Sequence, residues 1–218
     1  MKYKFSIIMT VYDQARELEE NLPAFLQQEY EAGYEVIVVD ESSTDETPDV
    51  LKLLKNDYPH LYSTFLPKPN RRVVRRKLAF SLGVKASKYE WVIFTKISKK
   101  PVATDILKAV SDSLENHAEL TLGYFCKKGI RLQPFTSYMD VRKYILRSER
   151  KLKKIRERKR MNYAWGRYDF IIVRKDQAYE LLKFYEQKLS PSELIGIRFN
   201  IFWQNLFGRS STTLLITE

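Results

Sequence analysis

Short apolar runs alternate with amphipathic stretches through the first 125 residues of the chain. Each run is rich in β-branched and aromatic residues and too short for a helix, which predicts a buried strand. The runs cover residues 5–11, 36–39, 62–66, 91–94 and 120–125. Between them, apolar residues at helical spacing predict helices over residues 14–28, 43–56, 73–87 and 102–116. This alternation predicts an α/β fold, with a mostly parallel sheet and helices on both faces.

Polar residues follow three of the predicted strands, at Asp13, Asp40 and Lys96. Ligands of parallel sheets bind beyond the carboxyl ends of the strands, so we expect these three loops to converge on one crevice. Asp13 also precedes a helix and is typical of an N-cap. Ser43 and Glu46 have the spacing of a capping box, which we favour over a role in ligand binding.

The alternation ends near residue 126. Beyond it, the pattern predicts a long helix over residues 139–160, a returning strand within 164–173 and a helix over 175–188. The segment 192–218 is rich in aromatic residues and ends in a predicted short strand. The second half is therefore expected to be basic and helical.

The predicted helix at residues 139–160 is strongly basic, with eleven Lys or Arg and two Glu between residues 142 and 160. Four apolar residues fall near one helical face: Val141, Ile145, Leu152 and Ile155. A basic amphipathic helix can lie on an anionic membrane surface. It can equally pack through its apolar stripe and leave a solvated outer face, and the pattern leaves both interpretations open.

Charge and cysteine content narrow the classes of partner. The formal net charge is +11 and the sequence pI is about 9.5, which favours anionic partners. No recognised nucleic-acid motif accompanies the charge, so a nucleic-acid partner is disfavoured. Cys126 is the single cysteine, which excludes an internal disulfide and fits a reducing compartment. No apolar stretch has the length of a transmembrane helix. We expect a cytoplasmic protein, with peripheral contact to the inner face of a membrane left open.

Four segments of the first half together resemble the opening of the family 2 glycosyltransferases, which have the GT-A fold. They read FSIIMTVYD at 5–13, EVIVVDESSTD at 35–45, RKLAFSLGVKA at 76–86 and EWVIF at 90–94. The resemblance implies one GT-A-type domain over residues 1–218, with a nucleotide-binding half (1–125) and an acceptor-side half (126–218). It also implies transfer of a sugar from a UDP- or GDP-sugar donor to a glycan or lipid-linked acceptor.

The resemblance also implies where the nucleotide lies. Carried over to this chain, the residues that line the base and ribose are Thr10, Val11, Tyr12 and Asp13. Asp40 would accept a hydrogen bond from a base N–H, a role that suits a carboxylate. Arg76 matches a basic position that faces the nucleotide. The alternatives are that Asp40 is an ordinary turn carboxylate and that the basic run around Arg76 is a solvated surface.

The chain departs from the family at the metal site. The family pattern after the fourth strand is Asp-x-Asp, which holds Mn²⁺ or Mg²⁺ at the donor diphosphate, and Lys96 and Ser98 stand at those positions. A hard divalent cation takes oxygen ligands, so these residues predict no metal site. With Lys99 and Lys100 they form a basic cluster that we interpret as a candidate diphosphate site. The alternative is a basic surface without a ligand.

A catalytic base is not evident either. The resemblance implies a downstream aspartate, often in an acidic pair, and no such pair follows residue 126. Asp169, Glu180 and Glu193 are isolated, and we interpret them as structural. The catalytic residue is therefore unknown at this level. Three functions stay open: an active glycosyltransferase, a degenerate nucleotide-binding or scaffold protein of the same fold, and a basic membrane- or nucleic-acid-surface module.

Overall fold

The computed structural model describes residues 3–67, 75–115, 120–126, 129–135 and 169–183. All of them lie within one compact unit, Met1–Glu186. The predicted basic helix at 139–160 and the predicted terminal strand after residue 192 fall outside the described residues, so both stay predictions.

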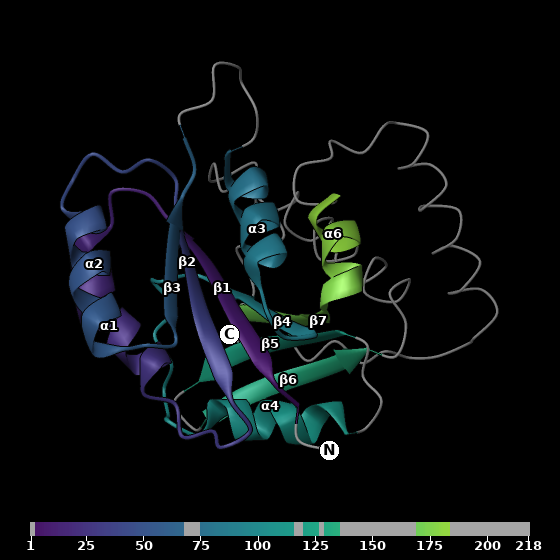
Figure 1. Cartoon of the computed structure of the whole chain (residues 1–218). Helices are drawn as coiled ribbons and strands as arrows, with labels where there is room; N and C mark the ends of the chain where they lie inside the picture. The colour runs from purple at the N-terminus through teal and green to yellow at the C-terminus, as the bar shows by residue number, and fades with distance from the viewer. Residues whose placement is uncertain (1–2, 68–74, 116–119, 127–128, 136–168, 184–218) are drawn as a thin grey trace, which may run out of the picture. The chain divides into compact units, whose positions relative to one another are not determined.

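A seven-stranded sheet forms the centre of this unit, in the order β3-β2-β1-β4-β7-β5-β6 (Figure 1). The strands are β1 (Phe5–Val11), β2 (Tyr34–Asp40), β3 (Leu61–Phe65), β4 (Trp91–Thr95), β5 (Leu120–Cys126), β6 (Gly129–Phe135) and β7 (Phe170–Arg174). Strands β1 to β4 are parallel to one another. Strand β7 is antiparallel to both β4 and β5, and β6 is antiparallel to β5.

Helices cover both faces of the sheet, as the alternating pattern predicts (Figure 1). They are α1 (Ala15–Leu26), α2 (Thr47–Asp57), α3 (Arg75–Ala86), α4 (Ile106–Leu114) and α6 (Lys175–Lys183). Successive strand residues point to opposite faces. Ile7 therefore packs in a cluster with residues of α1, α2 and α4, while its neighbour Ile8 packs with residues of α3 and α6. The predicted α/β architecture is confirmed for the described part of the chain.

Three element predictions differ from the structure. Helix α2 begins at Thr47 instead of Ser43, and α4 begins at Ile106 instead of residue 102. Strand β6 was not predicted, although Ile130 and Leu132 alternate along it and pack against the core on the α1 side. Polar residues or a proline lie at each of these positions, so the sequence pattern does not show where the element begins. Contacts with other elements determine the observed bounds.

No helix among the described residues combines the length and apolarity needed to cross a membrane. The sheet and its two layers of helices instead enclose a core in which every residue of β1 is buried.

Close packing of α3 on β1 gives the first prediction. A Cβ built at Gly83 falls 2.4 Å from Ile8 Cγ2, so an added methyl forces a buried β-branched side chain to move. Overpacking costs about 1–3 kcal/mol, against the roughly 1 kcal/mol that alanine gains over glycine in a helix. We expect Gly83→Ala to lower the free energy of unfolding by about 1–2 kcal/mol in chemical denaturation.

Lys85→Ala is the matched control, because Lys85 is exposed in the same helix. Its free energy of unfolding should stay within about 0.5 kcal/mol of the parent value. A Gly83→Ala protein at least as stable as the parent would show that α3 does not approach β1 this closely.

Candidate functional site

The carboxyl ends of the parallel strands place several loops at one edge of the sheet. Val11, Asp40 and Thr95 end β1, β2 and β4, which run side by side in the same direction. Strand β7 begins at this edge, since Phe170 pairs with Thr95 in an antiparallel register. Strand β5 ends there too, with Gly123 opposite Phe170. The three loops expected to converge therefore do so, and the start of β7 joins them.

The start of α1 is capped by side chains from the loop between β2 and α2, residues 41–46, together with the first residue of α2. The Gln14 N–H donates to Thr47 Oγ1 at 3.0 Å, and the Ala15 N–H donates to Asp45 Oδ2 at 3.1 Å. These bonds satisfy N–H groups that the first turn of a helix leaves open. Asp13 does not cap α1, so its interpretation as an N-cap is wrong.

Asp13 instead joins the two loops. Its Oδ1 accepts hydrogen bonds from the Thr44 N–H at 2.7 Å and the Thr44 hydroxyl at 3.3 Å, and its own N–H donates to Ser43 Oγ at 2.9 Å. Asp13 has φ 49° and Ser42 has φ 64°, a left-handed conformation that is uncommon outside glycine. Such conformations persist where the surroundings over-determine them. The two loops are thus held in one arrangement.

The predicted capping box is also wrong. Helix α2 has Glu46 as its N-cap residue, without a side-chain hydrogen bond to the helix, and a proline in its first turn. The Ser43 hydroxyl instead donates to Asp40 Oδ1, at the end of β2, at 2.6 Å. The sequence spacing fits a capping box, but Ser43 is engaged by Asp40 and Asp13 before the helix begins.

Asp40 is held rigidly at the end of β2. Its Oδ1 accepts from both the N–H and the hydroxyl of Ser43, at 2.9 and 2.6 Å, and its backbone oxygen accepts from the Leu66 N–H at 2.7 Å. The residue is only 6% exposed. Within the described part of the chain, its second oxygen, Oδ2, has no hydrogen-bond partner. An oriented carboxylate oxygen of this kind is a ready acceptor for a donor N–H.

The other residues predicted to bind the nucleotide differ in how exposed their side chains are to solvent. Thr10 and Val11 are buried at the end of β1, and the Val11 side chain belongs to the core on the α1 side. The Val11 carbonyl accepts from the Glu41 N–H at 2.8 Å, which adds a further link between the loops. Tyr12 is 43% exposed beside Asp13. Tyr12 and Asp13 therefore present side chains at the surface of the edge, whereas Val11 is committed to the core.

Arg76 is the second residue of α3. This helix follows β3 and precedes β4, two parallel strands, so it begins at the same edge as the loops. The backbone of Arg76 is accordingly near the predicted site. A role for its side chain stays a prediction.

The basic cluster after β4 consists of Lys96, Ser98, Lys99 and Lys100, and its lysines have different partners. Lys99 Nζ forms an ion pair with Asp169 Oδ1 at 2.8 Å. Lys100 Nζ donates to the backbone oxygen of Glu20 at 3.3 Å, on the side of α1. Lys96 is half-buried and has its own interaction, while Ser98 is exposed. Of the four candidates, Lys99 is therefore the lysine joined to the strand β7 side of the edge.

Asp169, which the sequence analysis interpreted as structural, has hydrogen bonds to two other strands. Its Oδ2 accepts from the Phe125 N–H at 2.7 Å, its N–H donates to the Gly123 oxygen at 3.1 Å, and its own oxygen accepts from the Thr95 hydroxyl at 2.9 Å. It thus connects the ends of β4 and β5 to the start of β7. The only available signal was a lone carboxylate before an apolar run, because the pairing of β7 with β4 and β5 is a long-range contact.

A divalent cation does not fit the residues at this edge. The loop after β4 offers no carboxylate, and both oxygens of Asp169 are engaged, one by Lys99 and one by the Phe125 N–H. No group of three or more His, Cys, Asp or Glu among the described residues could hold a metal ion. A hard cation needs several oxygen ligands, so no catalytic step is assigned to one here.

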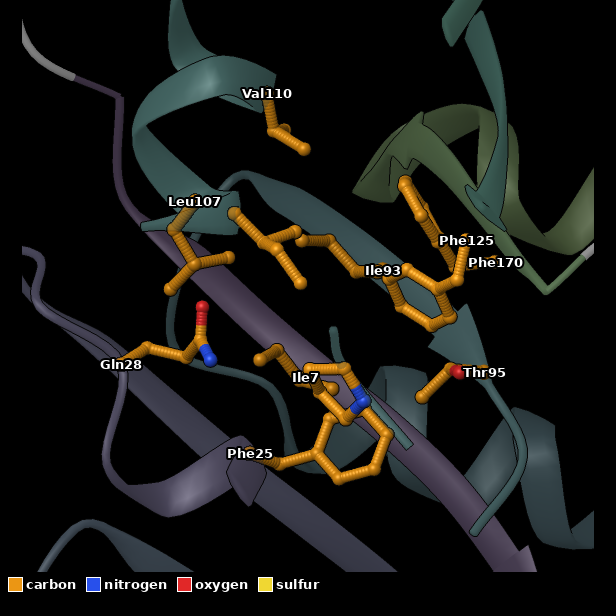
Figure 2. A pocket seen from close by; sticks show the side chains of 11 residues that line it. Ile7, Phe25, Gln28, Ile93, Thr95, Leu107, Val110, Phe125 and Phe170 are labelled. Atoms are coloured by element: carbon orange, nitrogen blue, oxygen red, sulfur yellow. The ribbon is translucent and has the colours of Figure 1, made fainter. Parts of the chain in front are cut away.

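A pocket lies between the sheet and helices α1 and α4, beside the loop that follows β4 (Figure 2). Figure 2 shows Ile7 and Ile93 of the sheet together with Phe25 and Leu107 of the helices around it. The Gln28 amide nitrogen donates to backbone oxygens of Ala24 and Ala103, which ties this loop to α1. The lining is mainly apolar, so the polar chemistry of the edge lies in the loops themselves.

Hydrogen bonds within these loops lower the pKa of one side chain, that of Asp45. Burial acts to raise the pKa of Asp45, but hydrogen bonds from the Thr47 hydroxyl and from the Ala15 and Thr47 N–H groups outweigh it and hold the pKa below its ordinary value. The folded state therefore favours the charged carboxylate. Its stabilisation is present above the pKa of the unfolded chain and is lost as pH falls through the folded-state pKa.

This shift gives a prediction for Asp45→Asn. The variant should be less stable than the parent at pH 7, because the amide lacks the charge that the three donors favour. Its stability should also fall less steeply than that of the parent between about pH 5 and pH 3. Urea denaturation across this range measures both. Asp112→Asn, at an exposed position of α4, is the charge-matched control. Identical acid limbs for Asp45→Asn and the parent would contradict the role given to these hydrogen bonds.

Comparison with known proteins bears on these loops. Residues 6–95 match the family model for glycosyl transferase family 2. No curated protein matches the chain. Among solved structures, TarS 1–349 of S. aureus is 23% identical, with 54% of this chain and 34% of that chain covered and a TM-score of 0.45. The mannosyltransferase PcManGT from Pyrobaculum calidifontis, in complex with GDP-Man and Mn²⁺, is 25% identical, with coverages of 55% and 35% and a TM-score of 0.48.

The chain thus spans about a third of the length of these two structures, at 34% and 35%. The matched segment 6–95 contains β1 to β4, the hydrogen-bonded loops around Asp13 and Asp40, and the start of α3. Through this segment the chain is similar to glycosyl transferase family 2, and its mixed sheet flanked by helices fits the GT-A-type fold predicted from the sequence.

Proposed function

We propose that the chain binds a nucleotide-sugar donor at the carboxyl edge of β1, β2 and β4 and transfers the sugar to a glycan or lipid-linked acceptor. The observation that carries this proposal is Asp40. Its carboxylate is held by Ser43, and its Oδ2 lacks a partner in the described part of the chain. The residue also lies inside the segment that matches the family model.

Each nucleotide residue has a proposed role. Asp40 accepts a hydrogen bond from a base N–H, which both uracil and guanine can supply, so UDP- and GDP-sugars are the donor classes. Tyr12 and Asp13 contact the base and ribose from the exposed side of the loop, with Thr10 and Val11 supplying its backbone. Arg76 approaches from the start of α3. The hydrogen bonds between the loops support the proposal, because a preformed site loses less entropy on binding.

The acceptor side of the proposal rests on the sequence. The basic segment 139–160 would place the protein, in the cytoplasm, against the inner face of an anionic membrane, where lipid-linked acceptors are found. The net charge of +11 is consistent with that contact.

A second candidate function is nucleotide binding without sugar transfer. The observation that favours it is the state of Asp169, whose backbone oxygen accepts a hydrogen bond from Thr95 at the end of β4. Lys99 and the Phe125 N–H engage both of its oxygens, which disfavours proton abstraction from an acceptor hydroxyl. Under this candidate the chain would keep the donor site and lack turnover.

Nucleotide binding tests the shared part of both candidates. We expect UDP or GDP, at about 100 times its dissociation constant, to stabilise the protein by about 2.7 kcal/mol in thermal or chemical unfolding. Asp40→Asn removes the charged acceptor and should weaken nucleotide binding about tenfold in calorimetry, since a hydrogen bond to a charged group contributes about 1.5–3 kcal/mol. Asp57→Asn, exposed at the end of α2, is the control and should bind like the parent.

A transfer assay separates the two candidates. The protein is incubated with UDP- and GDP-sugars, and released nucleotide and glycosylated acceptor are measured by mass spectrometry. Turnover that Asp40→Asn abolishes supports the transferase. Binding without loss of sugar from any donor supports the second candidate. If neither nucleotide binds, both are wrong.

A further inference from the structure

The loop after β4 carries an ammonium group, that of Lys99, beside the end of the strand. The resemblance to family 2 places Lys96 and Ser98 at the two Asp-x-Asp positions, and Lys99 follows Ser98 directly. Within the described residues, Asp169 is the partner of the Lys99 ammonium, at 2.8 Å. The positive charge at the end of β4 is therefore supplied by a side chain that the protein itself positions.

The two members of the ion pair differ in exposure, so one faces the protein and the other faces solvent. The Asp169 side chain is 13% exposed, whereas that of Lys99 is 41% exposed. A lysine ammonium has three N–H donors, and Asp169 Oδ1 takes one of them. The carboxylate thus lies on the protein side of the pair, and donors of Lys99 remain accessible from solvent.

The anchor of the pair is rigid. Asp169 has main-chain and side-chain hydrogen bonds to Gly123, Phe125 and Thr95, on two different strands. The Lys99 N–H donates to the Lys96 oxygen at 2.9 Å, which closes a turn in the loop. A lysine on a free surface loses considerable side-chain entropy when it binds a ligand. Lys99 has already lost part of this freedom to Asp169, so it loses less on binding.

The charge of the loop also suits an anion. Lys96 and Lys100 belong to the same loop and add positive charge to it, while Lys99 is the lysine on the β7 side of the edge. Lysine is a common phosphate ligand through its compact charge. Nucleotides of α/β sheets bind beyond the carboxyl ends of the strands, which is the edge where Lys99 lies.

We propose that Lys99, held in place by Asp169, takes the role of the divalent cation, so that this chain binds the diphosphate of a nucleotide without metal. The inference rests on the proposed donor site and adds how its diphosphate is recognised. Asp169 is a positioning residue for Lys99, and Lys99 contacts the ligand.

Binding of UDP and UMP to the full chain, by calorimetry, tests this proposal, with GDP and GMP as the second nucleotide pair. The measurements are made in EDTA and in MnCl₂. The dissociation constant for the diphosphate should agree within about twofold between the two buffers, because the residues present offer no ligand set for a hard cation. The diphosphate should bind more tightly than the monophosphate in EDTA.

Lys99→Met tests the residue itself. It should weaken diphosphate binding about tenfold, since it removes a charge-assisted hydrogen bond and leaves Asp169 unneutralised. Monophosphate binding should stay within about twofold of the parent, because the base and ribose contacts lie on the other loops. Lys108→Met, exposed on α4, changes the net charge equally and should leave both affinities unchanged.

The outcomes separate this inference from the donor site. If both nucleotides bind and manganese strengthens UDP binding tenfold or more, the metal-free inference fails and the donor site stands. Equal losses of UMP and UDP affinity in Lys99→Met also overturn it. If no nucleotide binds in either buffer, the donor site fails as well. The buffer comparison on the parent protein decides the question even if Lys99→Met does not fold.

Discussion

The pairing of β1 between β2 and β4 is the constraint on which the described structure depends. All seven residues of β1 are buried, and both neighbours run parallel to it. Parallel strands buried on both faces must carry apolar side chains in both directions, which is why Ile7 and Ile8 serve opposite layers. The same pairing brings the ends of three strands to one edge.

The carboxylates at the two edges of these strands differ in their hydrogen bonding. At the amino edge, Glu35 Oε1 accepts from the Ser6 hydroxyl and the Lys88 N–H, both at 2.7 Å, so its carboxylate is satisfied inside the protein. At the carboxyl edge, Asp40 uses one oxygen for Ser43 and keeps the other available among the described residues. Glu35 Oε2 also lies 3.9 Å from Lys88 Nζ, so of these two carboxylates only that of Asp40 presents an oxygen without a partner among the described residues.

The antiparallel half of the sheet alters the chemistry of that edge. Strand β7 lies between β4 and β5, which places Asp169 beside Thr95 and within reach of Lys99. Lys99 and the Phe125 N–H engage both oxygens of Asp169, so this carboxylate is available neither as a metal ligand nor as a free base, while the half-exposed ammonium of Lys99 keeps further N–H donors. The carboxyl edge thus combines the hydrogen-bonded loops around Asp13 and Asp40 with an ion pair after β4.

The sequence alone predicted the parallel strands, the helices on both faces and the resemblance to family 2 glycosyltransferases, because these depend on local periodicity and on motifs within residues 6–95. The resemblance also places Lys96 and Ser98 where the family pattern has its metal ligands. The sequence favoured a helix cap for Ser43 and left one open for Asp13, since each fits the local pattern of a cap. Only the tertiary structure decided that their hydrogen bonds cross between loops, that β6 pairs with β5, and that Lys99 meets Asp169. The Asp13–Thr44 and Lys99–Asp169 contacts join residues distant in the chain, and the register of β6 on β5 follows from how the strands pack together, which local spacing does not encode.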